Sequence, residues 1–460
     1  MSANNKKAQG LERSLGFGTL LAIAVSSVSP TTSVFISFGS MLTTVGTGVA
    51  LAFLVGGVIA VLNSLVYAEL GTAFPISGGA YAIILRVFGK PLGLITAILY
   101  LLLGLGSVPS LAIGTASYLN TMFPGISTTV FVIAVIVLAT LLAMARIHSA
   151  SWVTAVMVIL EFAIIIAVTI LCFAHVIHPL SLGFTTRAVE AKGIGGSLGI
   201  GVLFVALPIT LFSFSGYELS QNFSEETTNV RRVLSRTIII SAVIGVVIET
   251  LAVLGLTLAA KNLGAAASAT MPAYAIVQQA LGGNIATILL IGVIIATLDC
   301  TIAVNMSYIR VFYNAARDGM FTRRLSEWLS NVSMSTRVPV RIAIVWGIMV
   351  LVISVVGSLS AVLAFTGVVL VLIYALVSVA SFFARRKFPE RMAFRMPLWP
   401  LPALLVLISL IYVLTQQTPR FLEITGGVIV VTALYYTIVL RKGWRTHRIA
   451  DPEDAVDVLA

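Results

Sequence analysis

The sequence contains few charged residues. Asp, Glu, Lys and Arg make up 10% of its 460 residues, whereas a soluble domain carries about 25%. Hydrophobic residues make up 59% of the chain, and the mean hydropathy is +1.07. This composition excludes an ordinary soluble domain and indicates an integral membrane protein.

Cysteine and histidine are also scarce. The two cysteines, Cys172 and Cys300, both lie in apolar stretches, so we expect neither a structural disulfide nor a zinc site. The four histidines form no His-Glu-x-x-His pattern, and the chain has neither a nucleophile motif nor a phosphate-binding loop. We therefore expect no enzymatic activity, no metal and no cofactor.

Apolar runs long enough to cross a bilayer, about 20 residues each, recur along the whole chain. We count about twelve, which predicts one all-α polytopic membrane protein and not a series of separate domains. The expected spans cover residues 15–41, 45–70, 92–119, 128–145, 151–175, 200–221, 237–259, 284–312, 340–356, 360–384, 401–416 and 421–440.

The basic residues predict the orientation. If the N-terminus is cytoplasmic and the chain changes sides at each span, only Arg187, Lys192, Lys261 and Arg420 of the 28 Lys and Arg lie outside. This asymmetry follows the positive-inside rule and predicts a multi-pass protein of the cell membrane with both termini in the cytoplasm. The net charge of +11 then reflects topology and contact with anionic lipid, because scattered loop residues do not suit nucleic acid.

Two of the expected spans are interrupted by polar residues near their middle. The first carries Ser-Ser-Val-Ser-Pro-Thr-Thr-Ser at 26–33, and the sixth carries Phe-Ser-Phe-Ser-Gly-Tyr-Glu at 212–218. Such breaks are costly in hydrocarbon unless the freed backbone groups face protein or water. Matching breaks in two halves of a chain indicate the midplane substrate site of a transporter.

The loops and breaks predict a division of the chain into two five-helix repeats followed by two extra helices. The expected parts are a cytoplasmic N-terminus (1–14), a first repeat (15–176), an outer loop (177–199), a second repeat (200–384), two additional helices (385–441) and a cytoplasmic tail (442–460). The loop 261–283 is expected to hold short helices over the outer vestibule.

Three stretches, in the same order, resemble signatures of the amino acid–polyamine–organocation (APC) transporters. Residues 67–81 (YAELGTAFPISGGAY) resemble the stretch after the second helix of that family. Residues 214–218 (FSGYE) and 225–227 (EET) resemble its sixth helix and the following loop, and residues 310–320 (RVFYNAARDGM) resemble the loop after its eighth helix. The resemblance implies a LeuT-like fold with a 5+5 inverted repeat and alternating-access transport of amino acids or amines.

The two broken spans are expected to form the substrate site. Backbone amides at a half-helix N-terminus suit a carboxylate, and carbonyls that end a half-helix suit an ammonium. The simpler alternative is that the proline only kinks a packing helix and the serines bond back to it. The expected substrate-binding residues are Ser26, Ser27, Val28, Ser29, Pro30, Thr31, Phe212, Ser213, Phe214, Ser215 and Gly216.

The first span departs from the family pattern. Many amino-acid-transporting relatives have a Gly-Ser-Gly-type stretch where this chain has Ser-Val-Ser-Pro at 27–30. The missing glycines weaken the expected carboxylate clamp and favour an amine or amino-alcohol substrate. Phe212 aligns with the aromatic residue that closes over substrate in relatives and is the candidate outer gate; a phenylalanine that only packs is the alternative.

Glu161, Glu249 and Asp299 fall deep inside spans, with no Lys or Arg at comparable depth. A charge in the bilayer is costly, so each should face the bundle and be paired or protonated. Glu161 falls where some sodium-independent relatives carry a lysine that replaces a coupling cation, and because it is acidic that mechanism does not transfer. Glu161 and Asp299 are therefore candidates for proton coupling. The alternatives are a structural hydrogen bond for Glu161, and a substrate contact or a network with Asn305 for Asp299.

Four charged residues near the cytoplasmic ends of the spans, Glu69, Arg86, Arg317 and Asp318, are candidates for an inner gate. Breakable ion pairs suit gating, although solvated interfacial charges are the simpler interpretation. The whole pattern predicts a secondary transporter for an amino acid or related amine, proton-coupled or an exchanger. Sodium coupling and, in another class, a channel are the alternatives.

Overall fold

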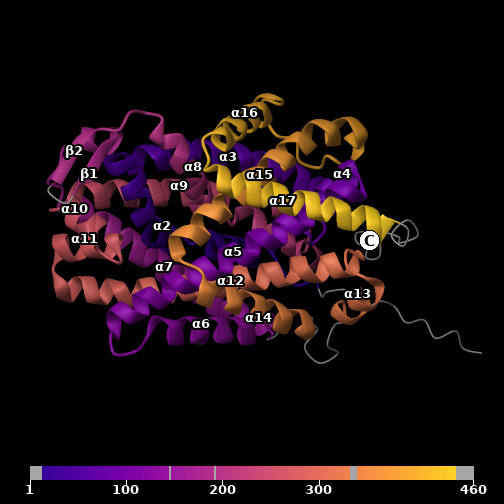
Figure 1. Cartoon of the computed structure of the whole chain (residues 1–460), viewed down its shortest axis with the longest axis horizontal. Helices are drawn as coiled ribbons and strands as arrows, with labels where there is room; N and C mark the ends of the chain where they lie inside the picture. The colour runs from indigo at the N-terminus through magenta and orange to yellow at the C-terminus, as the bar shows by residue number, and fades with distance from the viewer. Residues whose placement is uncertain (1–12, 145–146, 191–192, 332–338, 442–460) are drawn as a thin grey trace, which may run out of the picture.

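A computed structural model describes residues 13–144, 147–190, 193–331 and 339–441. Eight stretches, including the two broken helices, are long and apolar enough to cross a membrane, and shorter apolar helices accompany them. Every one of the expected spans coincides with a helix or with two consecutive half-helices, which confirms an all-α polytopic protein (Figure 1). Most of the predicted N-terminal segment and the tail 442–460 lie outside the described residues.

The other ten expected spans are unbroken helices. They are α3 (Val49–Ala73), α5 (Lys90–Met122), α6 (Thr128–Ala143), α7 (Ile147–Ala174), α9 (Val230–Ala259), α12 (Gly283–Arg317), α14 (Val340–Val356), α15 (Leu359–Lys387), α16 (Leu401–Thr415) and α17 (Pro419–Tyr435), the last continued by the π-helical turn η5 (Tyr436–Leu440).

Both predicted breaks are present. Helix α1 (Phe17–Val28) ends at Ser29, whose φ of 44° is left-handed, and α2 begins at Pro30 and runs to Val45. Pro30 occupies the first position of α2, where its missing N–H leaves no bond unmade. Helix α8 (Val202–Phe214) ends before Gly216, which has a φ of 128°, and the chain continues as the 3₁₀ segment η3 (Tyr217–Glu226).

The two ends of the bundle carry different short elements (Figure 1). The hairpin end, on the left of the view, holds the antiparallel strands β1 (Arg187–Glu190) and β2 (Gly193–Ser197) with α10 (Leu263–Ala267) and α11 (Pro272–Leu281). The opposite end, called the basic end, holds α4 (Gly79–Phe88) and α13 (Arg323–Leu329). The remaining short helical turns are η1 (Gly46–Gly48), η2 (Leu180–Phe184) and η4 (Pro389–Arg391).

Of the short elements, two helices were predicted, and the β-hairpin and α4 were not. Helices α10 and α11 occupy the loop for which short helices were predicted. The β-hairpin was not predicted because its glycine-rich segment carries no apolar period. Helix α4 was not predicted because its ten residues are too few to cross a bilayer. Gly79, with a φ of 56°, opens α4, a conformation that a residue with a side chain adopts only with strain.

The helices pack closely through small residues and expose apolar side chains outward. A methyl group on Gly57 of α3 would lie 2.5 Å from Val246 of α9, and one on Gly104 of α5 would lie 2.4 Å from Tyr308 of α12. Small residues of this kind let membrane helices approach one another. Ile408 and Ile438, by contrast, are 56% and 77% exposed, as expected for side chains that face lipid.

Candidate functional site

The two broken helices meet at the centre of the bundle. A methyl group on Gly216 would lie only 2.5 Å from the carbonyl carbon and oxygen of Ser27, so the two backbones touch where each helix is interrupted. Ser33 of α2 strengthens the contact, because its hydroxyl donates to the carbonyl oxygens of Ser213 at 2.6 Å and Val28 at 3.0 Å. Residues about 190 positions apart thus form one polar centre.

A small cavity of about 30 Å³ opens beside this contact. Five of the predicted site residues line it: Ser27, Val28, Phe212, Ser213 and Ser215. The remaining walls come from α2, α5, η3 and α12. The other lining residues are Thr32, Ser33, Ile36, Ser37, Ser107, Leu111, Glu218, Leu219, Cys300, Val304 and Tyr308. This described lining contains hydroxyls, one carboxyl group and no basic side chain.

The other predicted site residues lie behind the cavity wall. Phe214 is buried and packs edge-to-face on Phe53, with 5.3 Å between ring centroids. Ser26 donates to Asp299 Oδ2 at 2.7 Å, on the side of α12. Gly216 provides the backbone contact, while Ser29, Pro30 and Thr31 form the turn between α1 and α2. These residues shape the site and do not line it.

Glu161 of α7 caps the N-terminus of α2. Its Oε1 accepts from the Ser29 hydroxyl at 2.6 Å and from the Thr31 N–H at 3.2 Å. Its carbonyl oxygen also accepts from the Thr31 hydroxyl at 3.2 Å. A helix N-terminus favours negative charge, so Glu161 occupies the half-helix end that sequence reasoning assigned to a substrate carboxylate.

Glu218 is the site residue that sequence reasoning left out. It lines the cavity, is 1% exposed and accepts from the N–H of Gly216 at 3.0 Å. Buried tyrosines surround it, among them Tyr217 and Tyr308. The signal was present in the Gly-Tyr-Glu sequence at 216–218, but the expected substrate-binding residues ended at Gly216.

Asp299 and Asn305 do not bond to each other. Asp299 is 3% exposed, outside the described cavity lining, and holds Ser26. Asn305 instead accepts from Trp346 Nε1 at 3.0 Å. Among the residues that the structure describes, no group of His, Cys, Asp and Glu is arranged to hold a metal ion.

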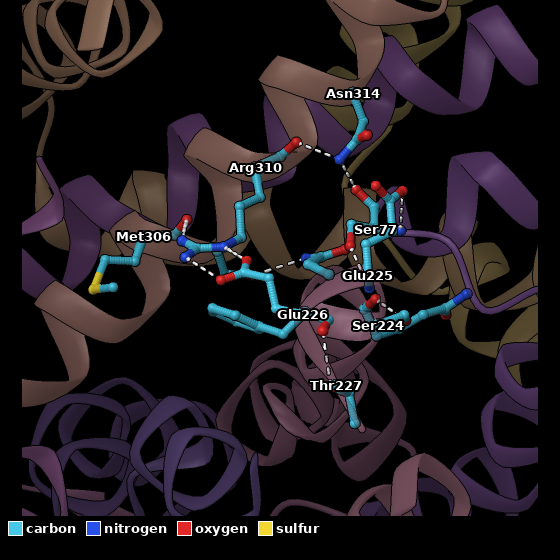
Figure 2. Close-up of polar contacts among 12 residues, drawn as sticks. Ser77, Ser224, Glu225, Glu226, Thr227, Met306, Arg310 and Asn314 are labelled. Carbon is cyan, nitrogen blue, oxygen red and sulfur yellow. Dashed lines mark hydrogen bonds and ion pairs between the residues drawn. The ribbon is translucent and has the colours of Figure 1, made fainter. Parts of the chain in front are cut away.

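A dense polar network joins α12 to Ser77 and to Glu225 and Glu226 (Figure 2). Arg317 of α12 makes a two-pronged ion pair with Glu225, at 2.8 and 2.9 Å. Glu225 also accepts from the N–H of Ser77 at 3.2 Å, and its own N–H donates to the Ser77 hydroxyl at 3.0 Å. Arg310 holds Glu226 in the same way, at 2.6 and 3.3 Å.

The same network fixes the start of α1. The N–H groups of Ser14 and Leu15 both donate to the Glu226 carbonyl oxygen at 2.9 Å, and the N–H of Thr228 donates back to Leu15. Asn314 of α12 donates to the carbonyl oxygens of Ser77 and Arg310 (Figure 2). We call Ser77, Glu225, Glu226, Arg310, Asn314 and Arg317 the basic-end lock.

The four candidates for an inner gate lie in two separate places. Arg317 belongs to the lock, and Asp318 beside it accepts from the Tyr81 hydroxyl at 3.1 Å. Arg86 lies within electrostatic range of Asp318 and donates to the carbonyl oxygen of Ala82. Burial raises the pKa of Asp318 above its ordinary value, although Arg317 and Arg86 partly offset the shift.

Glu69 lies apart from the other three. It is fully buried and accepts from Arg385 Nε and Nη2, and from the N–H of Met396, each at 2.6 Å. Arg385 also lies over the Trp399 ring, 4.8 Å from its centroid. This pair joins α3 to α15 and to the segment that leads into α16, so the structure does not bring Glu69 together with Arg317.

Comparison with known proteins agrees with this architecture. The family described as amino acid permease matches residues 15–440. Asc-type amino acid transporter 1 of Mus musculus is 28% identical over 240 residues, which are 50% of this chain and 45% of that protein. The branched-chain amino acid permease BcaP of Bacillus subtilis is 23% identical over 433 residues, 88% of each chain.

A third relative is the probable GABA permease of Pseudomonas aeruginosa, which is 27% identical over 206 residues, 44% of this chain and 43% of that protein. The alignments with the Asc-type and GABA relatives thus cover less than half of each relative's length. The family match, in contrast, runs through both broken helices and nearly the whole described bundle. The chain belongs to the amino acid permease family.

Proposed function

We propose that this protein is a secondary active transporter that moves an amino acid or a related amine across the cell membrane by alternating access. The supporting observation is the contact between Ser27 and Gly216, where two broken helices meet beside a cavity. Two short half-helices joined by unwound backbone can tilt against the rest of a bundle and expose a central site to either side in turn. The basic end faces the cytoplasm in this proposal.

The cavity favours a ligand that carries its own positive charge. The N-termini of both second half-helices are already occupied by carboxyl groups of the chain, α2 by Glu161 and η3 by Glu218. An incoming carboxylate would have to displace one of them. An ammonium, in contrast, meets Glu218 and serine hydroxyls on the lining, and a charge-assisted hydrogen bond is stronger than a neutral one.

The names of the relatives, which include an Asc-type transporter, a branched-chain permease and a probable GABA permease, define the range of ligands to test. We propose an α-amino acid, a γ-amino acid or a simple amine. Phe212 lies on the cavity lining and is half-buried, a position suited to an aromatic outer gate. The basic-end lock, with Arg317, Asp318 and Arg86, is the inner gate; Glu69 holds α3 and α15 together.

Coupling is proposed to use a proton. Glu161 caps the hinge of the broken helix and Asp299 holds Ser26 one turn earlier. Protonation of either carboxyl group would weaken a bond at the moving element, which links proton binding to helix movement. Sodium coupling through the same oxygens is the second candidate, because hydroxyls, carboxylates and unwound carbonyls are also sodium ligands.

The test has two steps. Thermal unfolding of the purified protein is measured with leucine, alanine, γ-aminobutyrate, putrescine and ethanolamine at two pH values, since a ligand that binds the folded state raises its apparent stability. The best ligand is then followed in liposomes. Uptake that saturates and is stimulated by the same ligand inside identifies a carrier. Flux that shows no counterflow with any of these ligands contradicts the proposal and favours a channel.

A further inference from the structure

Glu249 is a buried carboxyl group that the site described above does not use. It lies in the middle of α9 with no exposed surface, and neither carboxyl oxygen has a hydrogen-bond partner among the described residues. An unsatisfied buried polar group is costly, and an ionised one is far more costly. Packing alone therefore does not account for a glutamate at this position.

The Glu249 carboxyl group lies beside the break of the first span. A methyl group on Gly245, one turn earlier on α9, would lie 2.8 Å from Val28 Cγ1 and 3.4 Å from Glu249 Oε1. Val28 is the last residue of α1. Helix α9 packs against α1 and α2 as well as α7, so Glu249 faces the hinge from the side of α9.

Glu161 faces the same hinge from α7. It lies within electrostatic range of Glu249. Glu161 Oε1 accepts two hydrogen bonds from the hinge, but its Oε2 has no partner within the described part of the chain. Two carboxyl groups thus approach the hinge from neighbouring helices, each with unsatisfied oxygen, and neither lines the cavity.

Other titratable groups around Glu249 are engaged elsewhere or absent. The described elements α1, α2, α8 and η2, which pack on α9, contain no Asp, Glu, Lys, Arg or His. On α3, Glu69 pairs with Arg385. On η3, Glu218 holds Gly216, and Glu225 and Glu226 pair with arginines of α12. Asp299 of α12 lies within electrostatic range of Glu161 and holds Ser26. The arginines of α9 itself, at 231, 232 and 236, lie three or more turns from Glu249 along the helix. The tyrosine of α11, Tyr274, is neutral at physiological pH.

We propose that Glu161 and Glu249 form a proton-binding site behind α1, separate from the ligand cavity. Two carboxyl groups close together in a dry interior share one proton and titrate as a pair. The two donors and the helix N-terminus at Glu161 favour its ionised form. No donor among the described residues reaches Glu249, which favours its protonated form.

The pair connects proton binding to the hinge. A second proton, taken up from water by Glu161, removes the negative charge that caps α2. It thereby weakens the bonds from Ser29 and Thr31, which hold the two half-helices in their present arrangement. This inference rests on the proposed transport function and names the residues that carry its coupled proton.

The first experiment needs no transport ligand. Infrared spectra of the purified protein are compared with those of Glu249→Gln, which keeps the shape of a protonated glutamate. We expect the wild type to show a protonated-carboxyl C=O band at neutral pH that Glu249→Gln lacks. Glu423→Gln, which changes an exposed glutamate of α17, should keep the band. A wild-type spectrum without it, or a band that survives in Glu249→Gln, overturns the proton site.

The second experiment separates coupling from transport, with leucine, alanine or γ-aminobutyrate, whichever gives counterflow in the wild type. We expect Glu249→Gln to retain counterflow and to lose uptake driven by a pH gradient by roughly tenfold, a typical size of coupling between two sites. Unchanged pH-driven uptake overturns the inference. Loss of sodium-driven uptake in its place would assign the pair to a metal cation and also overturn it.

A variant that does not fold and a wild type without counterflow have different consequences. If Glu249→Gln does not fold, Glu161→Gln replaces it, and the Glu249 band should shift because its charged neighbour is gone; an unmoved band counts against the pair. Absence of counterflow in the wild type would refute the transporter itself, whereas intact counterflow with unaltered coupling refutes only the Glu161–Glu249 site.

Discussion

The centre of the bundle and its basic end hold the same helices together in opposite ways. At the basic end, α12 and the chain around η3 are joined by two-pronged arginine–glutamate pairs, with Arg310 also 4.4 Å from the centroid of the Phe223 ring. At the centre, the hinge is held by serine hydroxyls and by carboxyl groups that have no basic partner among the described residues. Strong ion pairs close one end, while carboxyl oxygens in the middle have no partner among the described residues and can be completed by a ligand or a proton.

The basic-end lock therefore stabilises the fold, and the centre of the bundle is the part that can change its conformation. Removal of one partner of a buried charge pair strongly destabilises a protein. The intact lock therefore stabilises the closed arrangement of the basic end. Carboxyl groups without a basic partner respond to a proton or an ammonium instead. We expect mutations at the two regions to give different phenotypes.

The largest effect is expected at the backbone contact between Ser27 and Gly216, where the two broken helices meet. Gly216→Ala would place a methyl group 2.5 Å from Ser27 backbone atoms at a φ of 128°. We expect a loss of about 3 kcal/mol or more in folding free energy and no measurable counterflow. Gly193→Ala is the control, because that glycine has a φ of 135° but no atom within 4 Å. Equal losses in both variants would attribute the effect to backbone strain and not to the contact.

The next effect tests the lock. Glu225→Gln breaks the pair with Arg317, whose side chains are 12% and 28% exposed, and we expect about 2 kcal/mol of lost stability in chemical unfolding. Transport should change as well, because the basic end opens more easily. Glu327→Gln removes the partner of Arg323 in a pair that is 65% and 92% exposed, and it should have no measurable effect on stability or transport.

A double-mutant cycle sharpens this prediction. The charge reversal Glu225→Arg with Arg317→Glu restores opposite charges, so it should be more stable than either single reversal. Additive losses would show that the two residues do not act as a pair.

A smaller effect is expected on ligand affinity at the centre. Glu218→Gln removes the negative charge of the one carboxyl group on the cavity lining, and we expect an amine-bearing ligand to bind about tenfold more weakly. The dissociation constant is measured by calorimetry. Ser107→Ala, at another lining position whose hydroxyl bonds to its own helix, should bind normally. Unchanged affinity in Glu218→Gln would remove this residue from the ligand site.

The smallest effect concerns pH at the basic end. Burial raises the pKa of Asp318 above its ordinary value, so the folded protein holds this proton to a higher pH than the unfolded chain does. The raised pKa of Asp318 therefore adds to the free energy of unfolding below the pKa of the unfolded chain, about 3.9. This contribution is lost as pH rises from that value through the pKa of the folded protein. We expect the stability of the wild type relative to Asp318→Asn to fall across that window. A difference that does not vary with pH would contradict the raised pKa.

Much of the architecture could be predicted because it depends on local composition. The spans follow from the length of apolar runs, and the breaks follow from Pro30 and Gly216, which limit a helix whatever its neighbours are. The hairpin could not be predicted, because its residues carry no period that distinguishes a strand from a loop, and α4, with ten residues, is too short to be recognised as a membrane span. Glu218 was missed for a related reason, since a 3₁₀ segment changes the register that an α-helix would give.

Pairing between distant residues was the part that sequence reasoning could not supply. Arg317 and Asp318 were grouped with Glu69 because all lie near span ends, yet Glu69 bonds to Arg385 and Arg317 bonds to Glu225. Glu161 was expected at the hinge, but its role as the cap of α2 depends on where α7 crosses the break. Such contacts depend on helix rotation and tilt, which many sequences with the same hydropathy could satisfy differently.

The sequence by itself determined that this chain is a bundle of membrane helices with two interruptions, because hydrocarbon requires every backbone group to be satisfied within its own segment or at a protected break. Only the tertiary structure decided that the interruptions touch, that carboxyl groups of the chain cap both half-helices, and that two buried glutamates face one hinge. Those facts depend on how helices pack side by side, and packing is set by close contacts between residues that lie far apart along the chain.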